Sequence, residues 1–142
     1  MSPCVFCGVV SHDVDARVIR EDAGTVAFMD LRQPIWPEGV HVLVIPKQHV
    51  EQVDELDPEV AAALMTAVVS VARVIRRHFA PEGISVWSSN GPAAFQEVPH
   101  VHMHVLTRKP DDSLLRVYAE RPLHPSTTEL EQVAATLRAG LA

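Results

Sequence analysis

Aromatic residues are scarce in this sequence: phenylalanine, tyrosine and tryptophan together account for 5% of its 142 residues. Hydrophobic residues nevertheless make up 47% of the chain, so valine, leucine, isoleucine and alanine must build most of the core. A chain of this length is typical of one domain. We therefore predict a single domain over residues 1–142, with its core at about 4–108 and a C-terminal extension with a helix at about 109–142.

Basic residues are fewer than acidic ones in this sequence. Lysine and arginine number 12 against 18 aspartate and glutamate residues, which gives a formal net charge of -6 with histidine neutral. The field of an acidic protein repels nucleic acid, so we expect no nucleic-acid partner. A small anionic ligand is not excluded, because a few local dipoles and donors are sufficient to bind one.

Long uninterrupted apolar runs are absent as well. The longest apolar tract, residues 60–75, is interrupted by Thr66, Ser70 and Arg73 and falls short of the length expected for a membrane span. A signal peptide carries positive charge ahead of an apolar run, and the N-terminal residues here do not. These features predict a cytoplasmic protein without a membrane partner.

The pattern of apolar and turn residues predicts an α+β fold. Asp57, Pro58 and Glu59 have the character of a helix start, and apolar residues then recur at helical spacing to Phe79. A short C-terminal helix is expected after the capping-box pattern Ser126–Glu129. Strands are expected in residues 17–31 (two strands with a turn at 22–24), 39–47, 84–89 and 98–107. These elements indicate an antiparallel sheet of about five strands with one long helix and one short one.

Three histidines alternate with apolar residues in the stretch PHVHMHVLTR, residues 99–108. On a strand, alternate side chains share one face, so His100, His102 and His104 would lie in a row about 7 Å apart. The residues between them would face the core beneath the long helix. Three imidazoles without partners would be costly to bury, so the histidine face cannot be ordinary core.

Three interpretations of this row remain open from the residues alone. It is a solvated strand face, a zinc site built on the His-x-His spacing, or the centre of a nucleophilic reaction on phosphorus. In the last case a neutral imidazole nitrogen attacks the phosphorus atom, while its second nitrogen is hydrogen-bonded to fix the tautomer. Neighbouring donors then stabilise the charge on the phosphoryl oxygens.

The stretch HVHMHVL resembles the signature of the histidine triad (HIT) superfamily, His-x-His-x-His followed by apolar residues. Three stretches resemble the family's motifs in the family's order: VIREDAGTVAFMDL its first nucleotide-contacting hairpin, GVHVLVIPKQHV its Ile-Pro-Lys-x-His strand, and NGPAAFQEVPHVHMHV its asparagine loop, glutamine and triad. The resemblance covers residues 4 to about 108. It implies a HIT-like fold, a homodimer, and hydrolysis or transfer of a nucleotidyl group at an α-phosphate.

The resemblance also implies roles for individual residues. His102 would be the nucleophile that takes the nucleotidyl group, with His100 positioning it and His104 binding the α-phosphate oxygens. His41 would be the family's fourth histidine, beside the phosphate. The other implied nucleotide-binding residues are Asp30 at the ribose hydroxyls, Asn90 on the phosphate side and Gln96 at the phosphate or the bridging atom.

A histidine at the third triad position, where the family's transferases mostly have glutamine, implies hydrolysis. We therefore expect a nucleotidyl hydrolase that attacks the α-phosphate of a purine nucleoside phosphoramidate and releases the nucleoside monophosphate through a nucleotidyl-histidine intermediate. A dinucleoside polyphosphate hydrolase of the Ap4A type is the alternative among enzymes. A nucleotide-binding regulatory module with little turnover is the alternative outside them. No organic cofactor is expected.

The two cysteines, Cys4 and Cys7, have the Cys-x-x-Cys spacing. In a reducing compartment such a pair is more typical of a metal or redox site than of a structural disulfide, and two buried thiols without metal are the simpler alternative. Some bacterial triad proteins that this sequence resembles bind a structural zinc through such a pair and two histidines. Here these histidines are His49 and His100, which implies a closed Cys2His2 zinc site.

Two positions depart from the family's pattern. Glu97 stands where the phosphoramidase branch has serine, and a carboxylate facing a phosphate would repel it. Either Glu97 points away, or the leaving group is cationic. Arg20 stands where an aromatic residue often borders the base, which makes a preference for purines less secure.

Overall fold

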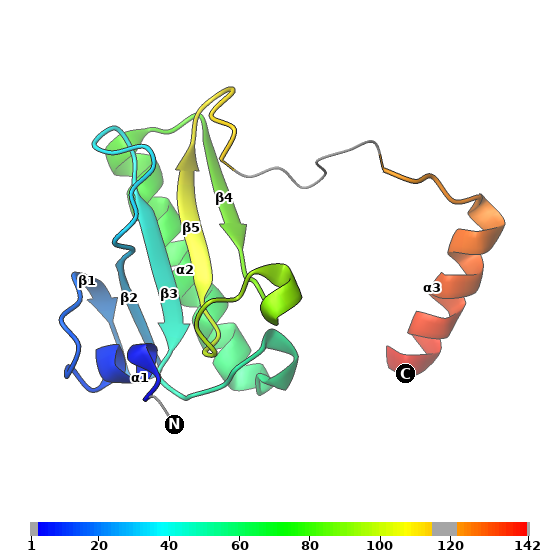
Figure 1. Ribbon diagram of the computed structural model, residues 1–142, viewed down its shortest axis with the longest axis horizontal. Coiled ribbons are helices and arrows are strands. Elements are labelled where there is room, and N and C mark those ends of the chain that lie inside the picture. The colour runs from blue at the N-terminus through cyan, green and yellow to red at the C-terminus, as the bar shows by residue number, and fades with distance from the viewer. Residues whose placement is uncertain (1–2, 115–121, 142) are drawn as a thin grey trace. The chain divides into compact units, whose positions relative to one another are not determined.

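Five strands form one antiparallel sheet in the computed structural model, which describes residues 3–114 and 122–141 (Figure 1). The strands follow the order β1-β2-β3-β5-β4 across the sheet, so β1 and β4 lie at its edges. Every neighbouring pair is antiparallel. The strand bounds are β1 (Val18–Glu21), β2 (Thr25–Met29), β3 (His41–Pro46), β4 (Gly83–Trp87) and β5 (Met103–Arg108).

Contacts between residues divide the chain into two units, residues 1–112 and 113–142. The first unit contains the sheet, and the second contains one helix. The helices are α1 (Val5–Val10) and α2 (Pro58–Phe79) in the first unit, with the single-turn helices η1 (Val53–Glu55) and η2 (Pro92–Ala94), and α3 (Thr127–Leu141) in the second.

α2 covers one face of the sheet with an apolar stripe. Its buried side chains recur at helical spacing: Leu64, Ala67, Val68, Val71 and Ile75. The strand residues that pack against this stripe include Ala27 on β2, Val42 and Val44 on β3, and Val105 on β5. This principal core confirms the long helix and the core-facing side that the sequence predicts.

α2 is also the one helix among the described residues that is long and apolar enough, by length and composition, to cross a membrane. The sequence-based expectation that this tract is too short is therefore corrected, because the helix extends beyond residues 60–75. Burial explains part of its composition, since one apolar stripe lies against the sheet while Arg73, Arg76 and Arg77 are exposed. These are the features of the core helix of a globular domain.

The opposite face of the sheet carries a second core and the histidines. Alternation along β3 directs Val42 and Val44 toward α2. It directs His41, Leu43 and Ile45 to the other face of the sheet. The side chains of this second core are Phe6, Val9, Val26, Phe28, Leu43 and Ile45. Two of them belong to α1, which the sequence did not predict, so α1 packs on the histidine-bearing face.

The strand that carries the triad is shorter than predicted. β5 begins at Met103, so His104 lies on it, whereas His100 and His102 lie in the segment that precedes it. The prediction of a strand over 98–107 was therefore wrong at its start, and the three histidines do not share one strand.

Two backbone hydrogen bonds explain the late start of β5. The N–H of His100 donates to the carbonyl of Val98 at 2.8 Å, and that of Val101 donates to the carbonyl of Val50 at 2.7 Å. The segment is thus bonded to itself and to the loop after β3 before it joins the sheet. Val101 and Val105 still lie in the principal core, as the alternation predicted.

The turn between the first two strands and the start of α3 form as predicted. Oδ1 of Asp22 accepts hydrogen bonds from the N–H groups of Gly24 and Thr25 at 2.9 and 2.8 Å. At α3, the N–H of Ser126 donates to the Glu129 carboxylate at 2.8 Å, and the N–H of Glu129 donates to the Ser126 hydroxyl at 3.2 Å. α3 has 15 residues, so it is longer than expected.

Candidate functional site

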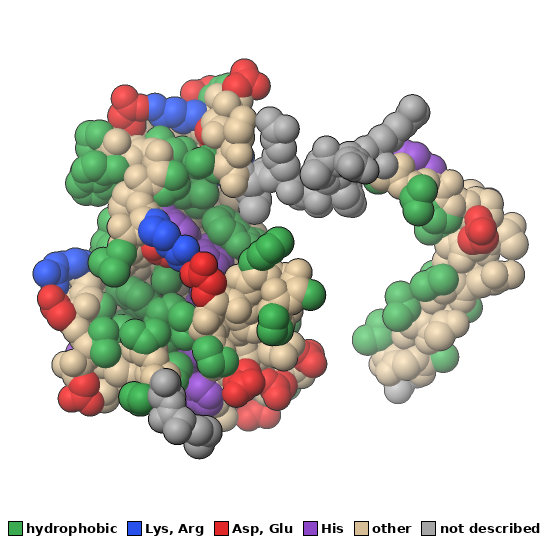
Figure 2. All heavy atoms as spheres, viewed as in Figure 1, with side chains coloured by type: hydrophobic (Ala, Val, Ile, Leu, Met, Phe, Trp, Pro, Cys, Tyr) green, Lys and Arg blue, Asp and Glu red, His purple; other side chains and the backbone are tan. Residues whose placement is uncertain are grey.

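Four histidine side chains are buried on the face of the sheet opposite α2. His41 begins β3 and His104 lies on the neighbouring β5. His100 and His102 belong to the segment before β5. Figure 2 shows histidine side chains at the centre of the visible face of the first unit, with basic and acidic side chains beside them.

Ring contacts fix the orientation of His104. Its ring stacks on Trp87, its partner on β4, with ring centroids 4.3 Å apart and planes inclined by 4°. Nε2 of His41 lies 2.9 Å from Nδ1 of His104. The ring centroids of His102 and His104 are 4.9 Å apart. This is closer than the separation of about 7 Å on a regular strand, since His102 precedes β5.

His102 has the tautomer that a nucleophile needs. Its Nδ1 lies 2.7 Å from the carbonyl oxygen of His100, and because a carbonyl can only accept, Nδ1 carries the proton. In the neutral ring Nε2 is then unprotonated, with a lone pair available for attack. Phe6 packs edge-on against the His102 ring at a centroid distance of 5.1 Å, which restrains the ring.

Burial keeps His41 and His104 neutral. The pKa of His104 is lowered to about 4, first by burial and then by the neighbouring His102 and His41. Burial also lowers the pKa of His41, although the charge of Asp30 opposes this. At neutral pH both rings are therefore uncharged hydrogen-bonding groups.

Asp30 follows β2 and is buried beside His41, with Oδ2 3.6 Å from Nδ1 of that ring. Burial alone would raise the pKa of Asp30, but hydrogen bonds from Arg32, together with the charge that His41 carries when it is protonated, outweigh burial and lower it. Gln33, which no sequence pattern singled out, holds this region together. Its side-chain amide donates to the carbonyls of Asp30 and His41 and accepts from the N–H of His41.

A cavity of about 480 Å³ lies beside Asp30. Apolar side chains from α1, β2 and β3 line most of it, among them Phe6, Phe28 and Leu43, and Asp30 and Arg32 contribute polar groups. A mostly apolar pocket with a few polar groups is the usual form of a small-molecule site. This cavity was not predictable from the sequence pattern, because that pattern does not indicate α1, which supplies part of the lining.

Asn90 and Gln96 are bonded to the backbone of neighbouring loops. Oδ1 of Asn90 accepts from the N–H of Val53 at 2.7 Å. Gln96 accepts from the N–H of Gly91 and donates to the carbonyl of Glu51, each at 2.7 Å. These bonds tie the loop before β5 to the segment after β3. Phosphate contacts by the two residues stay a prediction.

Glu97 is paired with a cation. Nη1 of Arg32 lies 3.2 Å from Oε2 of Glu97, and the Glu97 side chain is 69% exposed. Of the two alternatives that the sequence left open, this arrangement matches the one in which Glu97 points outward. The charge of Glu97 is balanced by a guanidinium that belongs to the protein itself.

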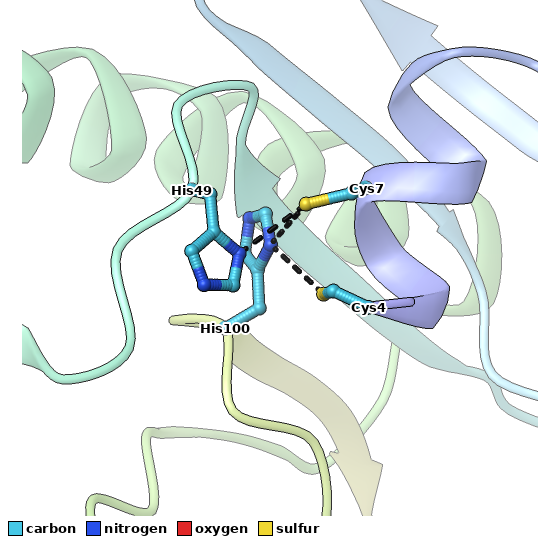
Figure 3. A group of neighbouring side chains, drawn as sticks. All are labelled: Cys4, Cys7, His49 and His100. Carbon is cyan, nitrogen blue, oxygen red and sulfur yellow. Dashed lines mark hydrogen bonds between the residues drawn. The ribbon is translucent and has the colours of Figure 1, made fainter. Parts of the chain in front are cut away.

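A second cluster contains both cysteines (Figure 3). Cys4 precedes α1 and Cys7 lies on it, His49 follows β3 and His100 precedes β5. The four side chains point toward one another, and one ligand atom from each lies within 4.8 Å of all the others. These are the four residues that the family resemblance grouped together.

The distances in this cluster fit a tetrahedral metal ion. Zinc at about 2.3 Å from sulfur and about 2.0 Å from nitrogen holds those two atoms about 3.5 Å apart. Cys4 Sγ lies 3.5 Å from Nδ1 of His100, and Cys7 Sγ lies 3.2 Å from Nδ1 of His49. Nε2 of His100 donates to the carbonyl of Pro46 at 2.8 Å, the kind of bond that orients a ligating histidine.

The triad histidines are not arranged around a single metal of their own. His100 directs Nδ1 to the cysteines and Nε2 to a backbone carbonyl. Asp30, His41 and His104 each have a possible ligand atom within 4.8 Å of the others. However, the nitrogens of the two histidines that face each other form a hydrogen bond of 2.9 Å. Zinc on all three triad histidines, one of the sequence-based alternatives, does not match this geometry.

Comparisons with known proteins point to one family. The model of the HIT domain matches residues 11–111. Protein hit of Bacillus subtilis (strain 168) is 40% identical over 105 residues, which cover 74% of this chain and 70% of that protein. An adenosine 5'-monophosphoramidase of Schizosaccharomyces pombe is 33% identical over 123 residues, which cover 86% of this chain and 87% of that protein.

Solved structures agree with the sequence comparisons. The crystal structure of a HIT family member from Bacillus subtilis matches with a TM-score of 0.87 at 32% identity, covering 99% of both chains. A zinc-bound histidine triad family protein from Mycobacterium smegmatis matches with a TM-score of 0.70 at 32% identity, covering 96% of both chains. The first match confirms the predicted fold class.

Proposed function

Because this chain belongs to the HIT family, we propose that it is a nucleotide hydrolase that attacks the α-phosphate of a nucleoside phosphoramidate. The observation that carries this proposal is the tautomer of His102, whose Nδ1–H is held by the carbonyl of His100 at 2.7 Å. The phosphoramidase activity is that of the Schizosaccharomyces pombe relative and is carried over to this chain as part of the proposal.

The proposed reaction has two displacements at phosphorus. In the first, the lone pair on Nε2 of His102 forms a bond to the α-phosphorus as the phosphorus–nitrogen bond to the leaving group breaks. The electron pair of that bond departs with the amine, which takes up a proton. Water then attacks the same phosphorus atom and loses a proton, the bond to His102 breaks, and the nucleoside monophosphate leaves.

The surroundings of His102 suit a nucleotide. The apolar cavity beside Asp30 has room for a base and a sugar, and the ionised Asp30 can accept hydrogen bonds from ribose hydroxyls. In this proposal, neutral His41 and His104 position the phosphoryl oxygens and move a proton along their 2.9 Å hydrogen bond. His100 acts through its backbone carbonyl, which orients the nucleophile.

The cluster of Cys4, Cys7, His49 and His100 is proposed to hold a structural zinc ion. The sulfur–nitrogen distances and the zinc-bound relative from Mycobacterium smegmatis support this. Four protein ligands leave no open coordination position. The ion would therefore attach α1 to the sheet and take no part in the reaction.

The family resemblance further implies a homodimer in the cytoplasm, with a nucleotide as its small-molecule partner and no membrane or nucleic-acid partner. We propose each of these properties for this protein. Light scattering on the purified protein tests the first of them.

AMP release from adenosine 5'-phosphoramidate by the wild type and by His102→Asn tests the proposed function. We expect the variant to lose at least about a thousandfold in activity, because the nucleophile of a group that acts as a unit is removed. His78→Asn, at an exposed histidine of α2, is the matched control and should keep wild-type activity. Diadenosine tetraphosphate, assayed in parallel, separates the polyphosphate hydrolase from the phosphoramidase.

Wild-type activity in His102→Asn would overturn the mechanism. If the wild type releases no AMP from either compound but still binds AMP in a calorimeter, the regulatory module becomes the better description.

A further inference from the structure

The short helix α1 contributes side chains to two separate cavities. Val5, Phe6 and Val9 line the cavity of about 480 Å³ that is proposed to receive the nucleotide. Cys4 and Cys7 line a second cavity, of about 720 Å³, and Val5 lines this one as well. The metal cluster, which the second cavity borders, consists of Cys4, Cys7, His49 and His100. α1 is therefore a wall shared by the nucleotide cavity and the metal cluster.

Phe6 is the direct link between these two places, because it precedes Cys7 in the chain. Its buried ring packs edge-on against Phe28, His102 and His100, at centroid distances of 5.5, 5.1 and 6.0 Å. A movement of Cys7 out of the metal cluster would move Phe6 as well. The nucleotide cavity would then lose part of its apolar wall, and the ring of the proposed nucleophile would lose a restraint.

His100 is a second link, through its backbone. Its Nδ1 lies 3.5 and 3.7 Å from the sulfur atoms of Cys4 and Cys7. Its carbonyl oxygen accepts the hydrogen bond from Nδ1 of His102 at 2.7 Å. One residue thus provides a ligand of the metal cluster and the group that orients the nucleophile, so a shift of this residue would affect both.

α1 has little to hold it in place besides these contacts. It has six residues and no side-chain hydrogen bond at its N-cap, and helices this short are marginal in water. Its buried side chains are Phe6 and Val9. Without a metal, detachment of α1 from the sheet is therefore a local opening that needs little free energy compared with unfolding of the whole domain.

The metal cluster is accessible from solvent. Cys4 and Cys7 are half-buried, His49 is exposed, and the second cavity lies beside them. A metal ion can therefore enter or leave while the sheet stays folded. A ligand that binds only when α1 is attached shifts the equilibrium toward the attached form. This applies both to a metal at the cluster and to a nucleotide in its cavity.

We propose that the metal cluster is an allosteric site: a zinc ion bound there keeps α1 attached to the sheet and thereby raises the affinity of the nucleotide cavity. This inference rests on the proposed function and concerns the regulation of its site. The ion takes no part in the reaction. Linkage makes the effect reciprocal, so a bound nucleotide raises the affinity of the cluster for zinc by the same factor.

Calorimetric titration of the zinc-loaded and the metal-free wild type with AMP tests the inference. Both proteins are measured below the melting midpoint of the metal-free protein, after excess zinc has been removed. We expect the dissociation constant for AMP to be about tenfold higher without metal and to recover when one equivalent of zinc is added. The double variant Cys4→Ser, Cys7→Ser should bind AMP with the affinity of the metal-free wild type, whether or not zinc is present.

Hydrogen exchange shows whether α1 is the element that connects the two sites. In the metal-free protein, we expect the backbone amides of residues 5–10 to exchange faster than in the zinc-loaded protein, and AMP to slow them again. If the metal stabilised α1 without any link to the nucleotide, AMP would not change their exchange.

Phe6→Leu weakens the packing of α1 and also changes the wall of the nucleotide cavity. The change in the wall affects AMP binding with and without metal, so it cancels in the ratio of the two dissociation constants. The weaker packing matters most where no metal holds α1, so this ratio should rise severalfold above that of the wild type. Phe79→Leu, on α2 and packed against the principal core, should leave the ratio unchanged.

A dissociation constant for AMP that is the same within about twofold with and without zinc overturns the inference. A wild type that binds no zinc, or no AMP in either form, overturns it as well. None of these measurements depends on turnover. A zinc effect on AMP affinity in a protein that releases no AMP contradicts the hydrolase function alone, whereas AMP release with an affinity that ignores zinc contradicts the allosteric site alone.

Discussion

His104 is 9% exposed, and its ring stacks with the rings of Trp87 and His41. Burial is the first reason that its pKa lies at about 4, whereas a histidine in an unfolded chain titrates near pH 6.5. Between these two values the unfolded chain binds more protons at this position than the folded protein does. The contribution of His104 to stability is therefore complete above about pH 6.5 and is lost as the pH falls toward 4.

We predict that, between pH 7 and pH 4, the wild type loses on the order of 3 kcal/mol more unfolding free energy than His104→Gln does. Urea denaturation at a series of pH values, under one fixed metal condition, measures this difference. His78→Gln removes an exposed histidine and should follow the wild-type curve. Parallel curves for the wild type and His104→Gln would show that His104 is not held neutral by the fold.

Several of the residues that gather at the site were predictable, but how they contact one another was not. The order of the motifs, through the family resemblance, pointed to His102 and to the four residues of the cysteine cluster. The partners of Glu97 were not predictable, because Arg32 is 65 positions away and no local pattern relates the two. Gln33 was missed for another reason: a glutamine in a loop has no distinguishing pattern until its backbone partners are known.

At the scale of elements, α1 has the weakest support from its own sequence. It has six residues, and its N-cap Cys4 makes no side-chain capping bond. Helices of this length are marginal in water on their own. Packing of Phe6 and Val9 in the second core holds it from one side, and the proposed zinc ion would hold it from the other.

Metal removal should therefore lower the stability of the protein measurably. We predict that the purified wild type contains one zinc ion per chain and that a chelator lowers its melting midpoint by at least about 5 °C. Without chelator, the double variant Cys4→Ser, Cys7→Ser should already have a melting midpoint near that of the chelator-treated wild type. Adding the chelator should not change it. Elemental analysis and calorimetric melting curves measure both effects. A wild type without zinc whose midpoint is unaffected by the chelator would contradict the proposed metal site.

The elements that the sequence predicted well are those with strong periodicity and clear boundaries. α2 has a repeated apolar stripe and a proline at its start, and β3 is a continuous apolar run between turn residues. β5 was placed too early because apolar alternation continues through His100 and His102, while the backbone there bonds to the loop after β3. Alternation reports which way side chains point, and it does not report which strand pairs with which.

At the scale of the whole molecule, the two units differ in how much they bury. Both hydrophobic cores lie within residues 3–112. The apolar side chains along one side of α3 are exposed: Leu130, Val133, Leu137 and Leu141. The first unit therefore contains its own source of stability.

We predict that a chain ending after Leu114 keeps the melting midpoint of the full chain within about 3 °C, because the truncation leaves in place every buried core residue that the structure describes. Its affinity for AMP should stay within about twofold of the full chain, since the described site residues all precede the cut. Calorimetric melting and AMP titration on the two proteins provide the comparison. A large drop in either quantity would show that the C-terminal unit supports the first.

The site joins parts of the chain that are remote in sequence. Cys4 meets His100 across 96 positions, Arg32 meets Glu97 across 65, and His41 meets His104 across 63. Closing such long loops costs entropy before any of these contacts forms, and folding slows as such contacts come to dominate. The site is thus expected to assemble late, after the sheet has brought its segments together. A peptide that contained only the triad sequence would therefore not form the site.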